Sequence, residues 1–276
     1  MTLYLFDDLS MSTKRIMSKE KILLKFGGSL ITEKMSDTPK INTINLDRIG
    51  KVLNNKEYDI IVVHGAGSFG HPIAQKFNLI DGLNESPEQK KSIAEIREQM
   101  EKLNHVLCSI IEKNGMKTKS VIPSKTMITK GARNIAKFPT EIFDKCIEEG
   151  NIPITFGDAT DDELQGINIL SGDVIMMELA RIYKPAFSVF VMDLPGVMDG
   201  DPKSKDSKVI PRVDAKIIRE LKEKTFSNGN TDVTGGLIGK LECALEIAQH
   251  SQCWITNLDS LEMVLTGNPR GSEVVL

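Results

Sequence analysis

The sequence has little of what would assign it to a specialised class of protein. Only 5% of its 276 residues are aromatic, and the net charge is only -3. It therefore has no excess of positive charge that would attract nucleic acid. No apolar run approaches the roughly 20 residues that a membrane-spanning helix requires. We expect neither a nucleic-acid partner nor a membrane partner, and the 40% hydrophobic content indicates an ordinary globular chain.

Cysteine is also scarce. The four cysteines form no C-x-x-C pair, and none has a histidine at the spacing of a zinc site. This predicts reduced, mostly buried thiols in a cytoplasmic protein. The first 20 residues lack the basic start, apolar centre and cleavage site of a secretory signal. We expect a peripheral extension at 1–20 and a single domain at 21–276.

What the sequence does contain is an alternation of two patterns. Apolar runs at 21–26, 59–64, 152–157 and 187–193 predict buried strands, and a long amphipathic pattern predicts a helix over 87–114. Such an alternation is typical of an α/β fold, a three-layer αβα sandwich with a mainly parallel central sheet. Further helices are predicted at 45–55, 140–150, 173–183, 214–224 and 235–250, and further strands at 117–123, 252–256 and 272–276.

A glycine loop, "HGAGSFGH" at 64–71, follows the second predicted strand and contains G-x-G-x-x-G. A dinucleotide-binding fold needs a helix directly after such a loop, then a strand and an acidic residue about 20 positions on. Here His71 and Pro72 lead into a short segment and then a broken polar stretch, so the sequence argues against dinucleotide binding. Two interpretations remain: a tight turn that needs glycine for its geometry, or a loop that holds another anion.

Three further glycine loops favour the anion. They are "KFGGS" (25–29), "LSGD" (170–173) and "TGGLIGK" (234–240), each after a predicted strand or at the start of a helix. Glycine lets backbone N–H groups approach an oxyanion, and helix N-termini favour negative charge. Four such loops in one α/β domain suggest a polyphosphate ligand.

Lysines accompany these loops. Lys25 interrupts a run that otherwise reads as core, and a buried lysine needs an anionic partner. Lys34 follows nine residues later, and Lys240 lies one helical turn after Gly236, so that it can point back toward the start of its helix. The Walker A and protein-kinase motifs are both missing from the sequence.

The motifs "KFGGSLITEK", "HGAGSFGH", "FGDA", "LSGD", "MDLPGVMDGDP" and "DVTGGLIGK" occur in this order, and together they resemble the amino acid kinase superfamily from about Lys21 onward. Within it, the histidine that closes the second motif is most similar to that of the isopentenyl phosphate kinases. The resemblance implies transfer of the γ-phosphoryl group of ATP onto isopentenyl phosphate, in the archaeal-type mevalonate route. It also implies Mg²⁺ carried by ATP, with no metal ligands from the protein, and a homodimer.

The resemblance assigns roles on the acceptor side, before about residue 173. His71 and the backbone of Gly172 would bind the acceptor phosphate, and Ala66 would lie between acceptor and donor. Lys34 would stabilise the moving phosphoryl group, and Asp158 would organise the lysines and the metal-nucleotide.

The ATP-binding side follows from about residue 173 onward, together with the first loop. The resemblance places the phosphates against the first lysine, against glycines of the loops and against the last lysine, and the nucleoside near two residues after the 187–193 strand. The residues implied are Lys25, Gly27, Gly28, Ser29, Gly67, Gly236 and Lys240 for the phosphates, and Asp193 and Val197 for the nucleoside.

The implied chemistry suits these residue types, because an acceptor that is already a phosphate anion needs no strong base. Phosphoryl transfer depends on alignment and on charge stabilisation. An isoprenoid acceptor also needs an apolar wall, for which Ile93, Ile96 and Met100 are candidates unless they are ordinary core. Two alternatives stay open: a kinase for fosfomycin or another small phosphate or phosphonate, and a non-catalytic anion-binding or storage protein.

Overall fold

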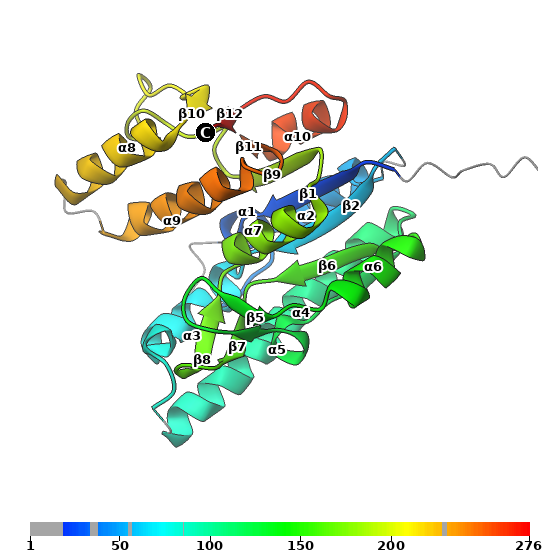
Figure 1. Cartoon of the computed structure of the whole chain (residues 1–276), viewed down its shortest axis with the longest axis vertical. Coiled ribbons are helices and arrows are strands. Elements are labelled where there is room, and N and C mark those ends of the chain that lie inside the picture. Colours follow the sequence, from blue (N-terminus) through cyan, green and yellow to red (C-terminus); the bar gives the residue numbers. More distant parts are fainter. Residues whose placement is uncertain (1–18, 34–37, 55–56, 85, 228–230) are drawn as a thin grey trace, which may run out of the picture.

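The computed structural model describes residues 19–33, 38–54, 57–84, 86–227 and 231–276. Its centre is an eight-stranded sheet in which most neighbouring strands run parallel (Figure 1). Within this sheet, the antiparallel pair is β11 with β12. β10 runs parallel to β12, so both strands run opposite to the others. The order across the sheet is β10 (Arg212–Val213), β12 (Ser272–Val274), β11 (Gln252–Asn257), β9 (Phe187–Met192), β1 (Lys21–Phe26), β2 (Asp59–His64), β6 (Ile152–Phe156) and β3 (Thr118–Ser120).

The central strands β1, β2, β6 and β9 are buried along almost their whole length, which is why the sequence shows them as continuous apolar runs. Successive side chains of a strand face opposite sides of a sheet. In β1, Ile22 and Leu24 belong to one buried cluster and Leu23 to the other. By the same alternation, Lys25 faces the side of Leu23.

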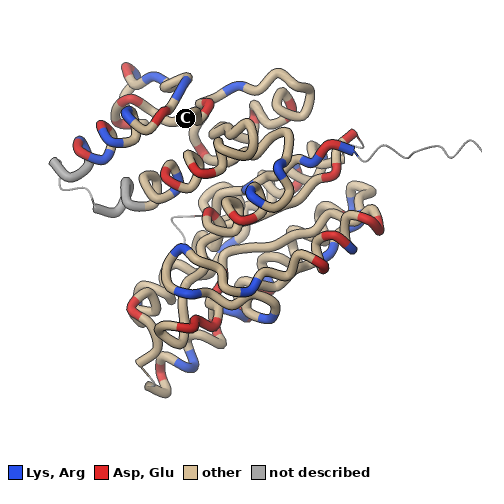
Figure 2. Tube along the Cα trace, in the orientation of Figure 1, with Lys and Arg blue, Asp and Glu red and all other residues tan. Residues whose placement is uncertain are grey.

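Helices cover both faces, as the αβα prediction required. The first cluster is closed by α2 (Thr43–Val52), α4 (Pro87–Lys113) and α10 (Leu258–Leu265). The second is closed by α6 (Thr140–Glu148), α7 (Gly172–Tyr183), α8 (Ala215–Ser227) and α9 (Thr231–Ile247). Charges of both signs are interspersed along the helices, as Figure 2 shows. In the described part of the chain, no helix combines the length and the apolar character needed to cross a membrane.

A second, four-stranded sheet lies below the first in Figure 1 and was not predicted. It consists of β5 (Ile135–Lys137), β4 (Ile128–Thr129), β7 (Asp158–Asp162) and β8 (Gly166–Leu170). β7 and β8 form an antiparallel hairpin, so the expected alternation of strands with helices is wrong here. The reason is that β7 has the sequence "DATDD", which lacks the apolar residues typical of a buried strand. In the structure, Asp162 of this strand accepts hydrogen bonds from the backbone of Gly131, Leu164 and Gln165.

Shorter helical segments occupy the loops after the strands. They are α1 (Gly28–Ile31), η1 (Gly67–Phe69), α3 (His71–Lys76), η2 (Leu79–Asp81) and α5 (Pro123–Thr126). The four cysteines are buried and form no disulfide, which confirms the prediction of free, buried thiols. The predicted extension 1–20 lies outside the described residues except for its last two.

Truncating the core of β1 tests this arrangement. Leu24→Ala removes a fully buried side chain and should lower the free energy of unfolding by about 3 kcal/mol, measured by urea denaturation. Ile44→Ala is the matched control, because Ile44 is 74% exposed and its loss should cost less than about 0.5 kcal/mol. Equal losses in the two variants would contradict the described core.

Candidate active site

Two glycine loops touch backbone to backbone at one edge of the sheet. β1 and β2 are parallel neighbours with Phe26 opposite His64, so the loops that follow them begin side by side. A Cβ atom on Gly28 would lie 2.2 Å from the nitrogen of Gly67, and one on Gly65 would lie 2.6 Å from the nitrogen of Gly28. Any side chain at Gly28 or Gly65 would therefore force the loops apart.

The loop that opens α7 joins them. A Cβ on Gly172 would lie 3.0 Å from Cε of Lys25 and 3.3 Å from the carbonyl oxygen of His64. Ser171 caps α7, because its hydroxyl accepts a hydrogen bond from the N–H of Asp173. Three of the four glycine loops seen in the sequence therefore converge.

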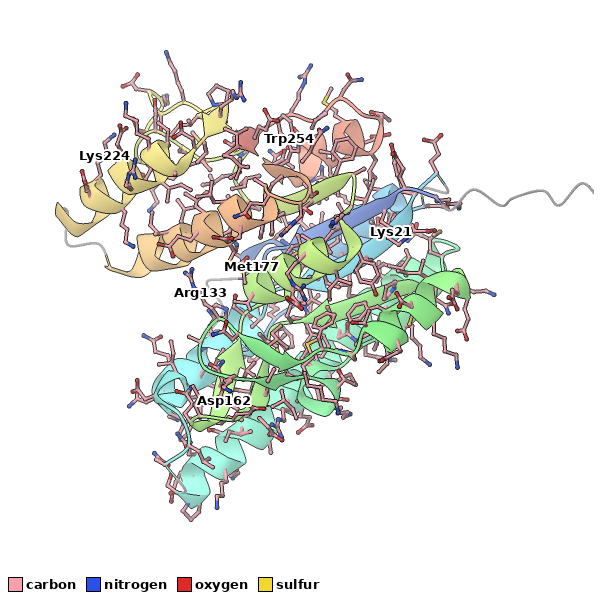
Figure 3. The ribbon with its side chains drawn as sticks, viewed as in Figure 1. Lys21, Arg133, Asp162, Met177, Lys224 and Trp254 are labelled. Carbon is pink, nitrogen blue, oxygen red and sulfur yellow. The ribbon has the colours of Figure 1, made fainter. Side chains whose placement is uncertain are left out.

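The fourth loop lies within α9. Gly236 is exposed, and nothing lies within 4 Å of the position of a Cβ there. Farther along the same helix, Lys240 does reach the convergence point. The small sheet also reaches α9: Arg133, in the turn between β4 and β5, donates to Glu242 at 2.5 Å and extends toward this helix in Figure 3.

The centre of the site is a buried cluster of three charges. The ammonium group of Lys25 forms an ion pair with Oδ1 of Asp173, and the ammonium group of Lys240 lies 3.0 Å from the same oxygen. Both ammonium groups also lie over the ring of Phe190, at 5.9 and 5.2 Å from its centroid. The prediction that Lys25 is buried and needs an anionic partner is thus confirmed.

Asp173 is the site residue that sequence reasoning missed. The sequence shows "LSGD" as a glycine loop, but the resemblance assigns the organising of the lysines to Asp158. In the structure, Asp158 is buried on β7, and its oxygens accept hydrogen bonds from the N–H groups of Ser124 and Ala159 at 3.0 and 2.8 Å. The expected contact of Asp158 with the lysines is therefore corrected: Asp173 holds them. The signal available in the sequence was Asp173, an acidic residue in the first turn of a predicted helix, together with Lys25, a lysine that needed an anionic partner.

Burial and charge set the pKa values in this cluster. Burial alone would raise the pKa of Asp173, but the two ammonium groups outweigh it and hold that pKa well below its usual range. Burial lowers the pKa of Lys25 to about 8, and the nearby cation Lys240 adds to this effect against the attraction of Asp173. Two ammonium groups that share one carboxylate carry an excess of positive charge, which favours the binding of another anion.

Backbone donors surround the same place. The N–H groups of Gly28, Ser29 and Gly67 lie in the first turns of α1 and η1, where a helix offers no acceptor of its own. In the part of the chain that the structure describes, these three groups meet no other acceptor. Together with the lysines, they suit the oxygens of a phosphate.

The remaining predicted residues are more scattered. His71 is exposed at the first position of α3, and Ala66 is half-buried directly before η1. Asp193 is exposed just after β9. Val197 packs in the second core cluster, and both its backbone groups are bonded, to Ser272 and Ile210. The predicted Lys34 lies outside the described residues.

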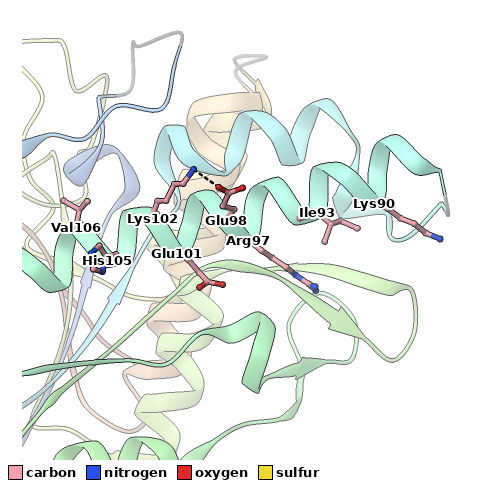
Figure 4. A pocket seen from close by; sticks show the side chains of 9 residues that line it. Lys90, Ile93, Arg97, Glu98, Glu101, Lys102, His105 and Val106 are labelled. Carbon is pink, nitrogen blue, oxygen red and sulfur yellow. Dashed lines mark ion pairs between the residues drawn. The ribbon is translucent and has the colours of Figure 1, made fainter.

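The candidate apolar wall on α4 divides between core and surface. Met100 is fully buried, and its sulfur lies 3.4 Å from the Cβ position of Gly70, directly against the second glycine loop. Ile96 and Ile93 belong to the same core cluster. Ile93 also borders an open hollow of about 850 Å³ on the outer side of α4, whose other lining residues include Lys90, Arg97, Glu98, Glu101 and His105 (Figure 4). No glycine-loop residue lines this hollow, so it is not the phosphate site.

Removing the shared carboxylate tests the cluster without any ligand. Asp173→Asn leaves two ammonium groups without their carboxylate, and should cost about 3 to 5 kcal/mol of unfolding free energy at pH 7. Asp259→Asn is the control, because its ion pair with Arg48 is exposed and should be worth less than about 1 kcal/mol. A loss of similar size in both variants, measured by urea denaturation, would contradict the described cluster.

The same measurement has an expected pH dependence. Because the pKa of Lys25 is about 8 when folded and 10.5 otherwise, the unfolded state binds more protons between these values. Lys25 should therefore make the protein more stable as pH rises from about 8 to 10.5. In Asp173→Asn the rise should begin at a lower pH, since the attraction that keeps Lys25 protonated is gone. A Lys25→Met variant should lack this increase in stability with pH.

Comparisons with known proteins identify the family of this chain. The sequence profile of the amino acid kinase family matches residues 20–257. Isopentenyl phosphate kinase of Methanothermobacter thermautotrophicus is 30% identical over 83% of this chain and 87% of its own, and that of Thermoplasma acidophilum is 32% identical over 82% and 86%. A crystal structure of an isopentenyl phosphate kinase superposes with a TM-score of 0.78 at 26% identity, covering 92% of this chain and all of that one. The chain belongs to the amino acid kinase family.

Proposed function

We propose that this protein is an isopentenyl phosphate kinase, which transfers the γ-phosphoryl group of ATP to isopentenyl phosphate and yields isopentenyl diphosphate and ADP. The observation that carries the proposal is the buried pair of lysines on Asp173, beside two glycine loops in backbone contact. Relatives with this activity match most of the chain. A solved Thermoplasma acidophilum isopentenyl phosphate kinase, determined as a product complex, superposes with a TM-score of 0.75.

In the reaction, an oxygen of the acceptor phosphate forms a bond to the γ-phosphorus while the bond to the β-phosphate oxygen breaks. The acceptor is already ionised, so no residue has to remove a proton from it. Lys25 and Lys240 stabilise the charge that spreads over the transferred group, and the amides of Gly28, Ser29 and Gly67 donate to its oxygens. Asp173 keeps both ammonium groups in place, and its charge opposes loss of the proton from Lys25.

Mg²⁺ bound to the phosphates of ATP would neutralise part of their charge. In the described ranges, no group of three or more His, Cys, Asp or Glu side chains is placed to hold a metal ion. The carboxylate of Asp173 is engaged by two lysines and that of Asp158 by two backbone donors. These residues fit an ion held mainly by the nucleotide rather than one resident in the protein.

The acceptor lies on the side of the chain before residue 173. His71, at the start of α3, and the backbone of Gly172 hold its phosphate, with Ala66 between acceptor and donor. The isoprenoid tail lies toward Met100 and Ile96 on α4, because Met100 lies against Gly70 of the second glycine loop and Ile96 belongs to the same core cluster.

The nucleotide lies on the side formed from residue 173 onward. Gly27 and Gly236 line its phosphates, and Asp193, which is exposed at the end of β9, lies near the nucleoside.

We also propose a homodimer in the cytoplasm, the compartment that four free buried cysteines suit. A light-scattering mass equal to one chain would exclude the dimer, and recovery in a membrane fraction would exclude the location.

Coupled release of ADP tests the function directly. With Mg-ATP, turnover should be strong with isopentenyl phosphate, weaker with dimethylallyl phosphate and negligible with fosfomycin. His71→Ala should raise KM for isopentenyl phosphate at least tenfold, because a charge-assisted hydrogen bond to the acceptor phosphate is lost. Turnover with fosfomycin alone would reassign the acceptor while keeping the kinase.

Lys34→Met separates a kinase from a storage protein in the same assay. We propose that Lys34 stabilises the moving phosphoryl group, so its loss should lower kcat at least a hundredfold while the Kd for ATP changes less than threefold. A wild-type protein that binds ATP but turns over no phosphate or phosphonate acceptor would favour the storage protein.

The pH profile tests the role of Lys25. Because its pKa is about 8 in the free protein, kcat/KM should fall as pH rises through about 8. The profile of kcat should fall at higher pH, since bound phosphates stabilise the protonated lysine. Asp173→Asn should move the fall in kcat/KM to lower pH. A flat profile between pH 7 and 9.5 would contradict this role.

A further inference from the structure

Thr32 joins the two glycine loops through one side chain. It directly follows α1, and it is 1% exposed. Its hydroxyl donates to the carbonyl oxygen of Gly28 at 2.8 Å and accepts from the N–H of Ser68 at 3.1 Å. One bond therefore ends on the loop after β1 and the other on the loop after β2.

The fit around this hydroxyl is close. Gly67 has a φ of 51°, and a Cβ on it would lie 2.1 Å from Oγ1 of Thr32 and 2.6 Å from the carbonyl oxygen of Gly28. The hydroxyl thus fills the space that the missing side chain of Gly67 leaves. Gly28, Gly65 and Gly67 contribute no side chains to the contact between the loops, and the Thr32 hydroxyl supplies a directional link across it.

The two linked loops have different tasks in the proposed reaction. The first carries Gly28 and Ser29, which face the phosphates of ATP, and the second carries Ala66 and leads to His71 on the acceptor side. The separation of the loops therefore sets the distance between the donor phosphorus and the attacking oxygen. Phosphoryl transfer is sensitive to this distance, and a misplacement of about 1 Å can cost a hundredfold in rate.

We propose that the Thr32 hydroxyl is a positioning group for phosphoryl transfer, which fixes the acceptor loop at 66–71 against the donor loop at 27–29. The inference rests on the proposed kinase function and deepens it. Thr32 touches neither substrate. It acts through the backbone of Gly28 and Ser68, so its loss should slow the chemical step and leave the binding of each substrate largely intact.

Matched substitutions isolate the hydroxyl. Thr32→Val keeps the shape of the side chain, and Thr32→Ser keeps the hydroxyl while losing the methyl group. We expect Thr32→Val to lower kcat at least tenfold with KM values for both substrates within threefold, and Thr32→Ser to retain kcat within threefold. Thr266→Val is the control, because the Thr266 hydroxyl bonds only the carbonyl oxygens of Glu262 and Met263 in its own helix.

If Thr32→Val does not fold, Thr32→Ala and Thr32→Ser give the same comparison, since they differ by the hydroxyl alone. A kcat that follows the melting temperature of the variants rather than the presence of the hydroxyl would overturn the proposal. So would a Thr32→Val enzyme that is as fast as the wild type.

Hydrogen exchange separates failure of this inference from failure of the proposed function. The amide of Ser68 should exchange at least tenfold faster in Thr32→Ala than in Thr32→Ser, while the amides of β2 stay unchanged. This readout needs no substrate, so it applies even if wild-type protein turns over no isopentenyl phosphate. Equal exchange of Ser68 in the two variants would overturn the link between the loops.

Discussion

The shared carboxylate of Asp173 is the interaction on which the site depends. Burying ammonium groups in a protein has a large desolvation free energy, which must be offset by a paired anion. Asp173 accepts two of them, one from the central strand β1 and one from α9. This single side chain at the start of α7 therefore ties together three elements that are far apart in the sequence. It leaves an excess of positive charge where a phosphate would complete the balance.

The glycine contact supplies the second constraint. Strand pairing brings Phe26 opposite His64, and only residues without a Cβ let the following loops approach as closely as they do. Close approach brings the amide groups of Gly28 and Gly67 side by side at the ends of neighbouring strands. The isoprenoid selectivity that we propose would then come from the neighbouring core, where Met100 packs against Gly70. α4 covers the face of the first cluster, whereas Lys25 lies on the opposite face, so the apolar and charged groups approach the glycine loops from different sides of the sheet.

The parts of the fold that could be predicted are those with a local pattern. The buried strands β1, β2, β6 and β9 are apolar because both faces of the sheet are covered, so each appears in the sequence as a continuous apolar run. The hairpin of β7 and β8 escaped prediction because the carboxylates of Asp158 and Asp162 accept hydrogen bonds from backbone donors and turns instead of facing solvent. Composition alone does not distinguish these two uses of an aspartate.

By itself, the sequence determined that Lys25 had to be buried and paired, and that glycine loops follow the ends of several strands. These conclusions depend on residue type and on neighbours within one element. Only the tertiary structure decided that the partner of Lys25 is Asp173 and not Asp158, and that Thr32 faces Ser68. Side-chain alternation turns Lys25 toward the helices of one face, and strand order then decides which helix begins there. Both carboxylates are plausible partners in the linear chain, because the distance between a lysine and its counter-ion is set by the order of strands and not by separation in sequence.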